Sequence, residues 1–138
     1  MKVVPDTNIF LSGIHWSGAS NKVLREWFIG SFTLVSSPQI NKELFTQLRD
    51  FKIQMETEEI EWWEDVILER SFMVIPKKKV NIVEKDPDDN KFIETALEGK
   101  VDYIVTQDKH LLNIEEFEGI KIVTPEEFLR ILKNDKPN

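Results

Sequence analysis

Short apolar runs alternate with longer amphipathic stretches along the chain. The apolar runs predict buried strands at residues 2–5, 32–35, 72–75, 103–105 and 120–123. Apolar positions spaced by three or four residues predict helices at about residues 9–14, 20–29, 38–48, 58–70, 86–98 and 125–133. Strands that alternate with helices in this way form β-α-β units, so the pattern predicts an α/β fold with a parallel sheet covered on both faces.

Polar residues that favour helix starts mark four of the predicted helices: Ser20, Ser37, Asp86 and Thr124. Pro38 follows one of them at the first helical position, where no hydrogen-bond donor is needed. Gly30 and Gly99 stand where two of the helices are expected to end. Capping chemistry therefore predicts the same boundaries as the hydrophobic pattern.

Length and composition predict one domain that spans residues 1–138. Apolar residues make up 41% and charged residues 31% of the chain, which is the balance of ordinary globular proteins. The absence of cysteine excludes disulfides, thiolate metal sites and a cysteine nucleophile, and with only His15 and His110 a zinc site would depend on carboxylates. No segment reaches the ~20 apolar residues of a membrane span and no signal-peptide pattern is present, so we expect a cytoplasmic protein without membrane contact.

The net charge of −7 argues against a protein that simply coats nucleic acid, since such proteins are normally basic. It does not exclude an enzyme that acts on nucleic acid. Acids gathered around divalent cations would have part of their charge neutralised where the substrate binds.

Two acids follow predicted strands directly or nearly so: Asp6 after the first strand and Asp108 after the fourth. Sites in open parallel sheets form outside the carboxyl ends of the strands, so these two carboxylates meet if their strands are neighbours. Glu43 and Asp89 lie on adjoining predicted helices. Carboxylates that are brought together repel one another unless a cation intervenes, and hard divalent ions such as Mg²⁺ prefer oxygen ligands.

Each acid also has an ordinary structural explanation. Asp6 and Asp108 suit turns or caps, and Glu43 suits an exposed helix surface. Asp86 before a proline suits an N-cap, with Asp89 in the first helical turn favoured by the helix dipole. Only the joint placement of the acids favours a functional site.

Four sequence blocks occur in an order that resembles the PIN-domain ribonucleases, the family that includes VapC-like toxins of toxin–antitoxin pairs. The blocks are VVPDTN at 3–8, INKEL at 40–44, DNKFIETA at 89–96 and YIVTQDKHLL at 103–112. The runs DPDDN at 86–90 and IVTQD at 104–108 together resemble the branch described as toxin components. The resemblance covers nearly the whole chain and implies a three-layer α/β/α fold around a central parallel five-stranded sheet.

The resemblance also implies Mg²⁺- or Mn²⁺-dependent cleavage of single-stranded RNA. It assigns catalytic roles to four acids: Asp6, Glu43, Asp89 and Asp108. Asp6 and Asp108 would anchor the metal and Asp89 would complete the site, with Asp86 as a rival or partner ligand. Residues that would orient carboxylates and water are Thr7, Asn8 and Thr106. The expected partners are the RNA substrate, an antitoxin protein and a second copy of the chain.

Three alternatives remain for the function. An RNA-processing nuclease would need no antitoxin, and a scaffold or binding module would keep the fold without the chemistry. A phospho-receiver domain is disfavoured because the third predicted strand ends in Ile75-Pro76-Lys77, without the aspartate that such a domain phosphorylates.

The residues that contact substrate are less sharply indicated. Candidates for phosphate contact, by their closeness to the motifs, are Lys22, Arg25, Lys91, Lys109 and His110, although ordinary solvated side chains give the same pattern. Trp16 is a candidate for stacking on a base. Trp62 and Trp63 cannot both face the core from one helix, so one is expected to be exposed, and Lys77–Lys79 suit a solvated loop.

Overall fold

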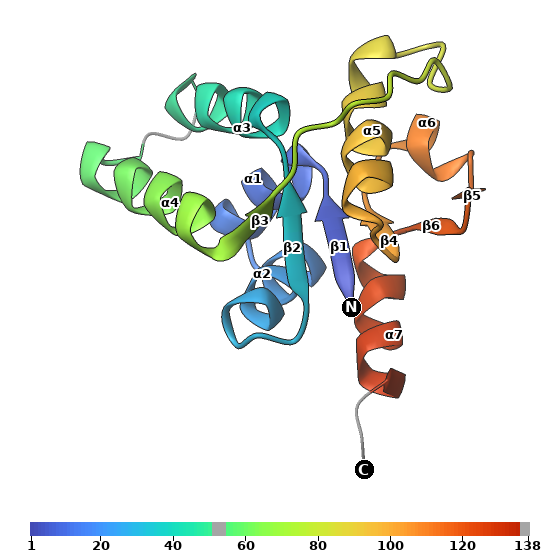
Figure 1. Cartoon of the computed structure of the whole chain (residues 1–138). Helices are drawn as coiled ribbons and strands as arrows, with labels where there is room; N and C mark the ends of the chain where they lie inside the picture. The colour runs from blue at the N-terminus through green and yellow to red at the C-terminus, as the bar shows by residue number, and fades with distance from the viewer. Residues whose placement is uncertain (51–54, 136–138) are drawn as a thin grey trace.

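Six short strands form the sheet around which the described chain is built (Figure 1). The computed structural model describes residues 1–50 and 55–135. The strands are β1 (Lys2–Pro5), β2 (Thr33–Ser36), β3 (Ser71–Met73), β4 (Tyr103–Val105), β5 (Glu116–Phe117) and β6 (Ile120–Val123). Their order is β3-β2-β1-β4-β6-β5, and every neighbouring pair is parallel except β5 with β6. The predicted five-stranded parallel sheet is therefore present, with one antiparallel strand added at its edge.

Helices connect the strands and cover both faces of the sheet. They are α1 (Thr7–His15), α2 (Ala19–Phe28), α3 (Pro38–Asp50), α4 (Thr57–Arg70), the 3₁₀ helix η1 (Pro87–Asp89), α5 (Asn90–Gly99), α6 (Lys109–Leu112) and α7 (Pro125–Asp135). This arrangement is the predicted three-layer α/β/α fold. Among these described helices, none is both long enough and apolar enough to cross a bilayer.

Two apolar cores lie on the two faces of the sheet, because side chains along a strand alternate in direction. Val3 and Leu34 point to the core formed with α1, α2, α4 and α7. Their neighbours Val4 and Val35 point to the other core, which α5 covers. Gly99 permits close packing on that side, because a Cβ atom there would lie 2.7 Å from Val35 Cγ1.

Several helix boundaries differ from the prediction. The N-cap of α2 is Gly18, and Ser20 is buried within the first turn. Asp86 occupies the N-cap position of η1, but its side chain accepts no hydrogen bond from that helix. Thr124 caps α7 as expected, since Glu127 N donates to its Oγ1 (3.1 Å) and its own hydroxyl donates to Glu127 Oε1 (3.0 Å). The predicted exposure of one tryptophan of α4 is also found, at Trp62.

Two short elements were not predicted, namely α6 and the strand β5. The turn between β5 and β6 is formed by Glu118 (φ 47°) and Gly119 (φ 86°), and positive φ at both central residues is typical of a tight hairpin. The strand has two residues, too few to show an alternating pattern. The third strand also starts one residue earlier than predicted and ends at Met73, although Val74 N still donates to Ser36 O (2.9 Å).

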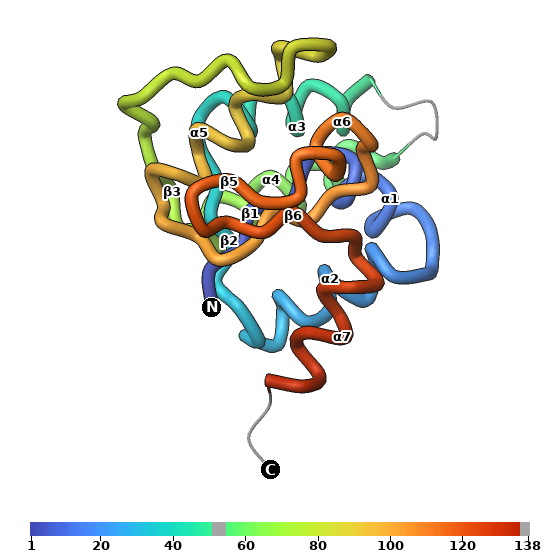
Figure 2. Tube along the Cα trace, turned by 90° about the vertical axis from the view of Figure 1, so that its right-hand side faces the viewer, coloured from blue at the N-terminus to red at the C-terminus, as the bar shows by residue number. Residues whose placement is uncertain are grey.

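The carboxyl ends of β1 and β4 lie side by side, because the two strands pair in parallel. The long connection from β3 to η1 passes over this same end of the sheet, whereas α2 and α7 lie at the opposite end of the molecule (Figures 1 and 2). The topology therefore brings the ends of β1 and β4 and the connection that follows β3 to one edge of the sheet.

Candidate metal centre

Asp6 and Asp108 stand at the adjacent carboxyl ends of β1 and β4. Each also caps a helix, because Ile9 N donates to Asp6 Oδ1 (3.1 Å) and His110 N donates to Asp108 Oδ1 (2.8 Å). The capping explanation is therefore correct for both residues, but it occupies one oxygen of each carboxylate. The caps fix the direction of the side chains, and the second oxygen remains for other interactions.

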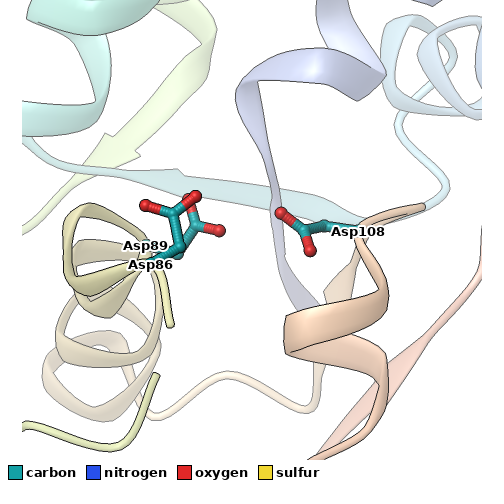
Figure 3. A group of neighbouring side chains, drawn as sticks. All are labelled: Asp86, Asp89 and Asp108. Carbon is teal, nitrogen blue, oxygen red and sulfur yellow. The ribbon is translucent and has the colours of Figure 1, made fainter. Parts of the chain in front are cut away.

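Three aspartates approach one another closely at this edge: Asp86, Asp89 and Asp108. One carboxylate oxygen of each lies within 4.8 Å of the others, and Figure 3 shows Asp108 directed from its loop toward Asp86 and Asp89. Asp86 and Asp89 lie three residues apart at the two ends of η1, so the short helix presents both on one side. The sequence left open whether Asp86 is a cap or a ligand, and among the described residues its side chain forms no cap hydrogen bond.

Asp89 carries the clearest mark of a missing partner. Its Oδ2 atom is buried and has no hydrogen-bond partner among the described residues. Burial raises the pKa of Asp89 to about 8, with further contributions from a proton shared with Asp108 and from the negative charges of Asp86 and Asp108. Burial and neighbouring negative charge both favour the protonated carboxyl, and a bound cation would favour its ionised form instead.

Asp6 forms the buried wall of the same site. Only 4% of the residue is exposed, and burial raises its pKa to about 6, with smaller contributions from the charges of Asp108 and Glu43. The Thr106 hydroxyl donates to Asp6 Oδ2 and lowers the pKa again, and Thr106 Oγ1 accepts from Asp108 N (2.9 Å). Thr106 thus ties the two strand-end aspartates together.

Glu43 reaches the site from α3 and is held by two side chains. Thr7 Oγ1 donates to Glu43 Oε2 (2.6 Å), and Lys91 Nζ lies 3.2 Å from Glu43 Oε1. Lys91 is 9% exposed and also pairs with Asp88 Oδ2 at 3.0 Å. The sequence did not predict this bridging role for Lys91, because no local pattern signals an ion pair between helices so distant in the chain.

The five predicted acids line one cleft of about 160 Å³, together with Thr7 and Asn8. These acids are Asp6, Glu43, Asp86, Asp89 and Asp108. Carboxylate oxygens are the ligands that Mg²⁺ and Mn²⁺ prefer, and both the unsatisfied Asp89 oxygen and the mutual repulsion would be relieved by such an ion. The residues present therefore fit a hard divalent cation.

The other predicted substrate contacts are dispersed. Lys22 and Arg25 line a different cavity between α2 and α7, and Lys109 and His110 are exposed on α6. Trp16 is 52% exposed after α1. None of these residues lines the acidic cleft.

Comparisons with known proteins identify related sequences. A family model described as "PIN domain" matches residues 2–110. The uncharacterized protein MJ1680 of Methanocaldococcus jannaschii is 31% identical over 145 residues, a match that covers 94% of this chain and 90% of that protein.

Two solved structures share the fold at low sequence identity. The crystal structure of PAE2754 from Pyrobaculum aerophilum has a TM-score of 0.62 at 12% identity, covering 97% of this chain and 90% of that one. The crystal structure of FitAcB from Neisseria gonorrhoeae has a TM-score of 0.54 at 11% identity, covering 90% of this chain and 98% of that one.

Proposed function

The chain belongs to the PIN domain family, and from that premise we propose that it is a Mg²⁺- or Mn²⁺-dependent endoribonuclease that cuts single-stranded RNA. The observation that carries the proposal is the cleft in which Asp86, Asp89 and Asp108 approach within 4.8 Å while a buried oxygen of Asp89 lacks a partner. PIN domains are generally metal-dependent nucleases, and this donor set suits the ions that such nucleases use.

The proposed ligands are Asp86, Asp89 and Asp108, with Asp6 contributing from the buried wall of the cleft. When bound, a divalent ion supplies Lewis acidity, which activates water and stabilises negative charge on phosphate oxygens. Asp6, Glu43, Asp89 and Asp108 are the proposed catalytic residues.

The surrounding side chains hold these carboxylates in place. Thr106 fixes Asp6 through its hydroxyl, and Thr7 fixes Glu43. Lys91 holds Glu43 from the other side, which directs that carboxylate to the cleft where it can orient a water molecule. Asn8 is exposed at the mouth of the cleft and is the remaining proposed orienting residue.

The test is cleavage of labelled single-stranded RNA with Mg²⁺, with Mn²⁺ and with EDTA. We expect activity with either ion and none with EDTA. Asp6→Asn, Asp89→Asn and Asp108→Asn should each lower the rate by more than the roughly 10–100-fold that loss of an outer-sphere partner costs. Asp65→Asn, an exposed change on α4, is the matched control and should be neutral. Full activity of Asp89→Asn or Asp108→Asn would refute the assignment.

The proposed biological role is the toxin of a toxin–antitoxin pair, acting as a homodimer and held inactive by an antitoxin protein. The support is the resemblance of the runs at 86–90 and 104–108 to that branch of the family. Induced expression should arrest growth, co-expression of the adjacent gene should relieve the arrest, and sedimentation should report a dimer. RNA cleavage without toxicity would favour an RNA-processing nuclease, and metal binding without cleavage would favour a non-catalytic binding module.

A further inference from the structure

A second and larger groove adjoins the acidic cleft. It has a volume of about 710 Å³ and lies between α3 on one side and η1 with α5 on the other, with residues 79–81 closing a third side. Glu43, Gln47 and Asp88 line both hollows, so the groove leads directly into the cleft. Its volume lies within the roughly 300–1,000 Å³ typical of ligand pockets.

The wall formed by residues 79–83 is firmly attached to α5. Asn90 Oδ1 accepts hydrogen bonds from Ile82 N (3.0 Å) and Val83 N (2.9 Å), and Glu94 Oε2 accepts one from Val80 N (2.9 Å). Lys79 is exposed in a loop, as the sequence predicted, and the backbone that follows it is held in position by these hydrogen bonds.

The acids of the groove are already engaged. Glu43 and Asp88 pair with Lys91, and Glu94 accepts from the backbone of the wall. Across the part of the chain that the structure describes, Lys42 and Lys79 form no ion pair, and both are exposed. Lys42 and Lys79 are therefore the two lysines of the lining that remain to contact a ligand's phosphates. With Lys91 they balance the charges of Glu43, Asp88 and Glu94, so the lining as a whole is neutral in a chain that carries −7.

The remaining polar lining suits unpaired bases. Gln39, Gln47 and Asn81 present side-chain amides, which can both donate to and accept from base edges. Single-stranded RNA exposes those edges, whereas a duplex buries them in pairing.

We infer that this groove binds the RNA strand on one side of the cut, with Lys42 and Lys79 contacting backbone phosphates and the amides facing the bases. The inference rests on the proposed nuclease function and adds to it the path of the substrate. It assigns the strand to the space between α3 and α5, rather than to Lys22, Arg25 or the exposed residues of α6.

The test measures binding of a fluorescently labelled single-stranded RNA to the Asp108→Asn protein by anisotropy, at several salt concentrations with Mg²⁺ present. Adding K42Q and K79Q should weaken binding on the order of tenfold, and should make the slope of log K against log salt shallower by about 1.4, or ~0.7 per phosphate contact. The matched control is K22Q with K133Q, an equal charge change in the cavity between α2 and α7. It should leave the affinity and the slope nearly unchanged.

Equal losses in the two double variants would overturn the inference, because net charge alone would then explain them. Unchanged binding in the K42Q/K79Q protein, or no RNA binding by the Asp108→Asn parent, would overturn it as well. Cleavage by the otherwise unaltered protein is measured separately. Cleavage with a KM that K42Q/K79Q leaves unchanged would refute RNA binding in the groove and support the nuclease function. RNA binding that depends on the two lysines, without cleavage, would support the groove and refute the nuclease function.

Discussion

Replacing Asp6 with asparagine should remove a pH dependence from the stability of the metal-free protein. Asp6 is 4% exposed, and burial raises its pKa from 3.8 to about 6. Below pH ~4 the carboxyl is protonated in both the folded and the unfolded chain. Between pH ~4 and ~6 the unfolded chain releases a proton that the folded chain retains, so the free energy of unfolding falls as the pH rises. The difference between about 6 and 3.8 corresponds to a loss of roughly 3 kcal/mol above pH ~6.

The measurement is urea unfolding in EDTA at pH values from about 4 to about 8. The amide that D6N introduces does not ionise, and its altered hydrogen bond to Thr106 adds an offset that is independent of pH. The stability of D6N minus that of the wild type should therefore rise by roughly 2.5 kcal/mol across this range, because part of the full change already occurs below pH ~4. Asp65→Asn should show no such trend. A D6N difference that stays constant with pH would refute the argument that burial suppresses the ionisation of Asp6.

Three further predictions concern other residues. Because the pKa of Asp89 is about 8, Mn²⁺ binding near pH 7 should release close to one proton. Calorimetry in buffers of different ionisation enthalpy measures this release, and an equal release by Asp89→Asn would contradict the prediction. Gly13→Ala should lower the free energy of unfolding by about 1–3 kcal/mol, since a Cβ atom would lie 2.6 Å from Leu24 Cδ1 and 2.9 Å from Ser20 O. An unchanged midpoint of urea unfolding would contradict this and show that α1 and α2 can move apart. Lys100→Gly should raise the free energy of unfolding by up to about 1 kcal/mol, because Lys100 has a left-handed backbone (φ 51°). A lower melting temperature of the variant would contradict this prediction.

The fold was predictable because most of its elements have strong local signals. The four-residue strand β1 is followed at once by Asp6, and α3 begins at Pro38 after a capping serine. The elements that were missed have two and four residues, β5 and α6, and such lengths carry almost no periodic pattern. Burial of Ser20 within the first turn of α2 depends on tertiary packing, which capping preferences do not describe.

The acids that the sequence indicated line one cleft, but the contacts that connect them were not predictable. The sequence blocks indicated the acids, yet local spacing does not reveal that Lys91 joins Glu43 to Asp88, or that one threonine links Asp6 to Asp108. Lys42 and Lys79 were missed for the same reason. They line one groove because the segment after β3 returns across α5 opposite α3, a path held by hydrogen bonds from its backbone to side chains of α5.

The central position of β1 has a consequence for how the protein is made. This strand is synthesised before the other strands of the sheet, but it lies between β2 and β4 and needs residues 103–105 to complete its hydrogen bonding. A growing chain must therefore keep residues 2–5 unpaired on one side until β4 has been made, and a contact between residues so distant in the chain forms slowly. Asp6 and Asp108 come together only after that pairing, so the acidic cleft forms late, once residues 103–108 have joined the sheet.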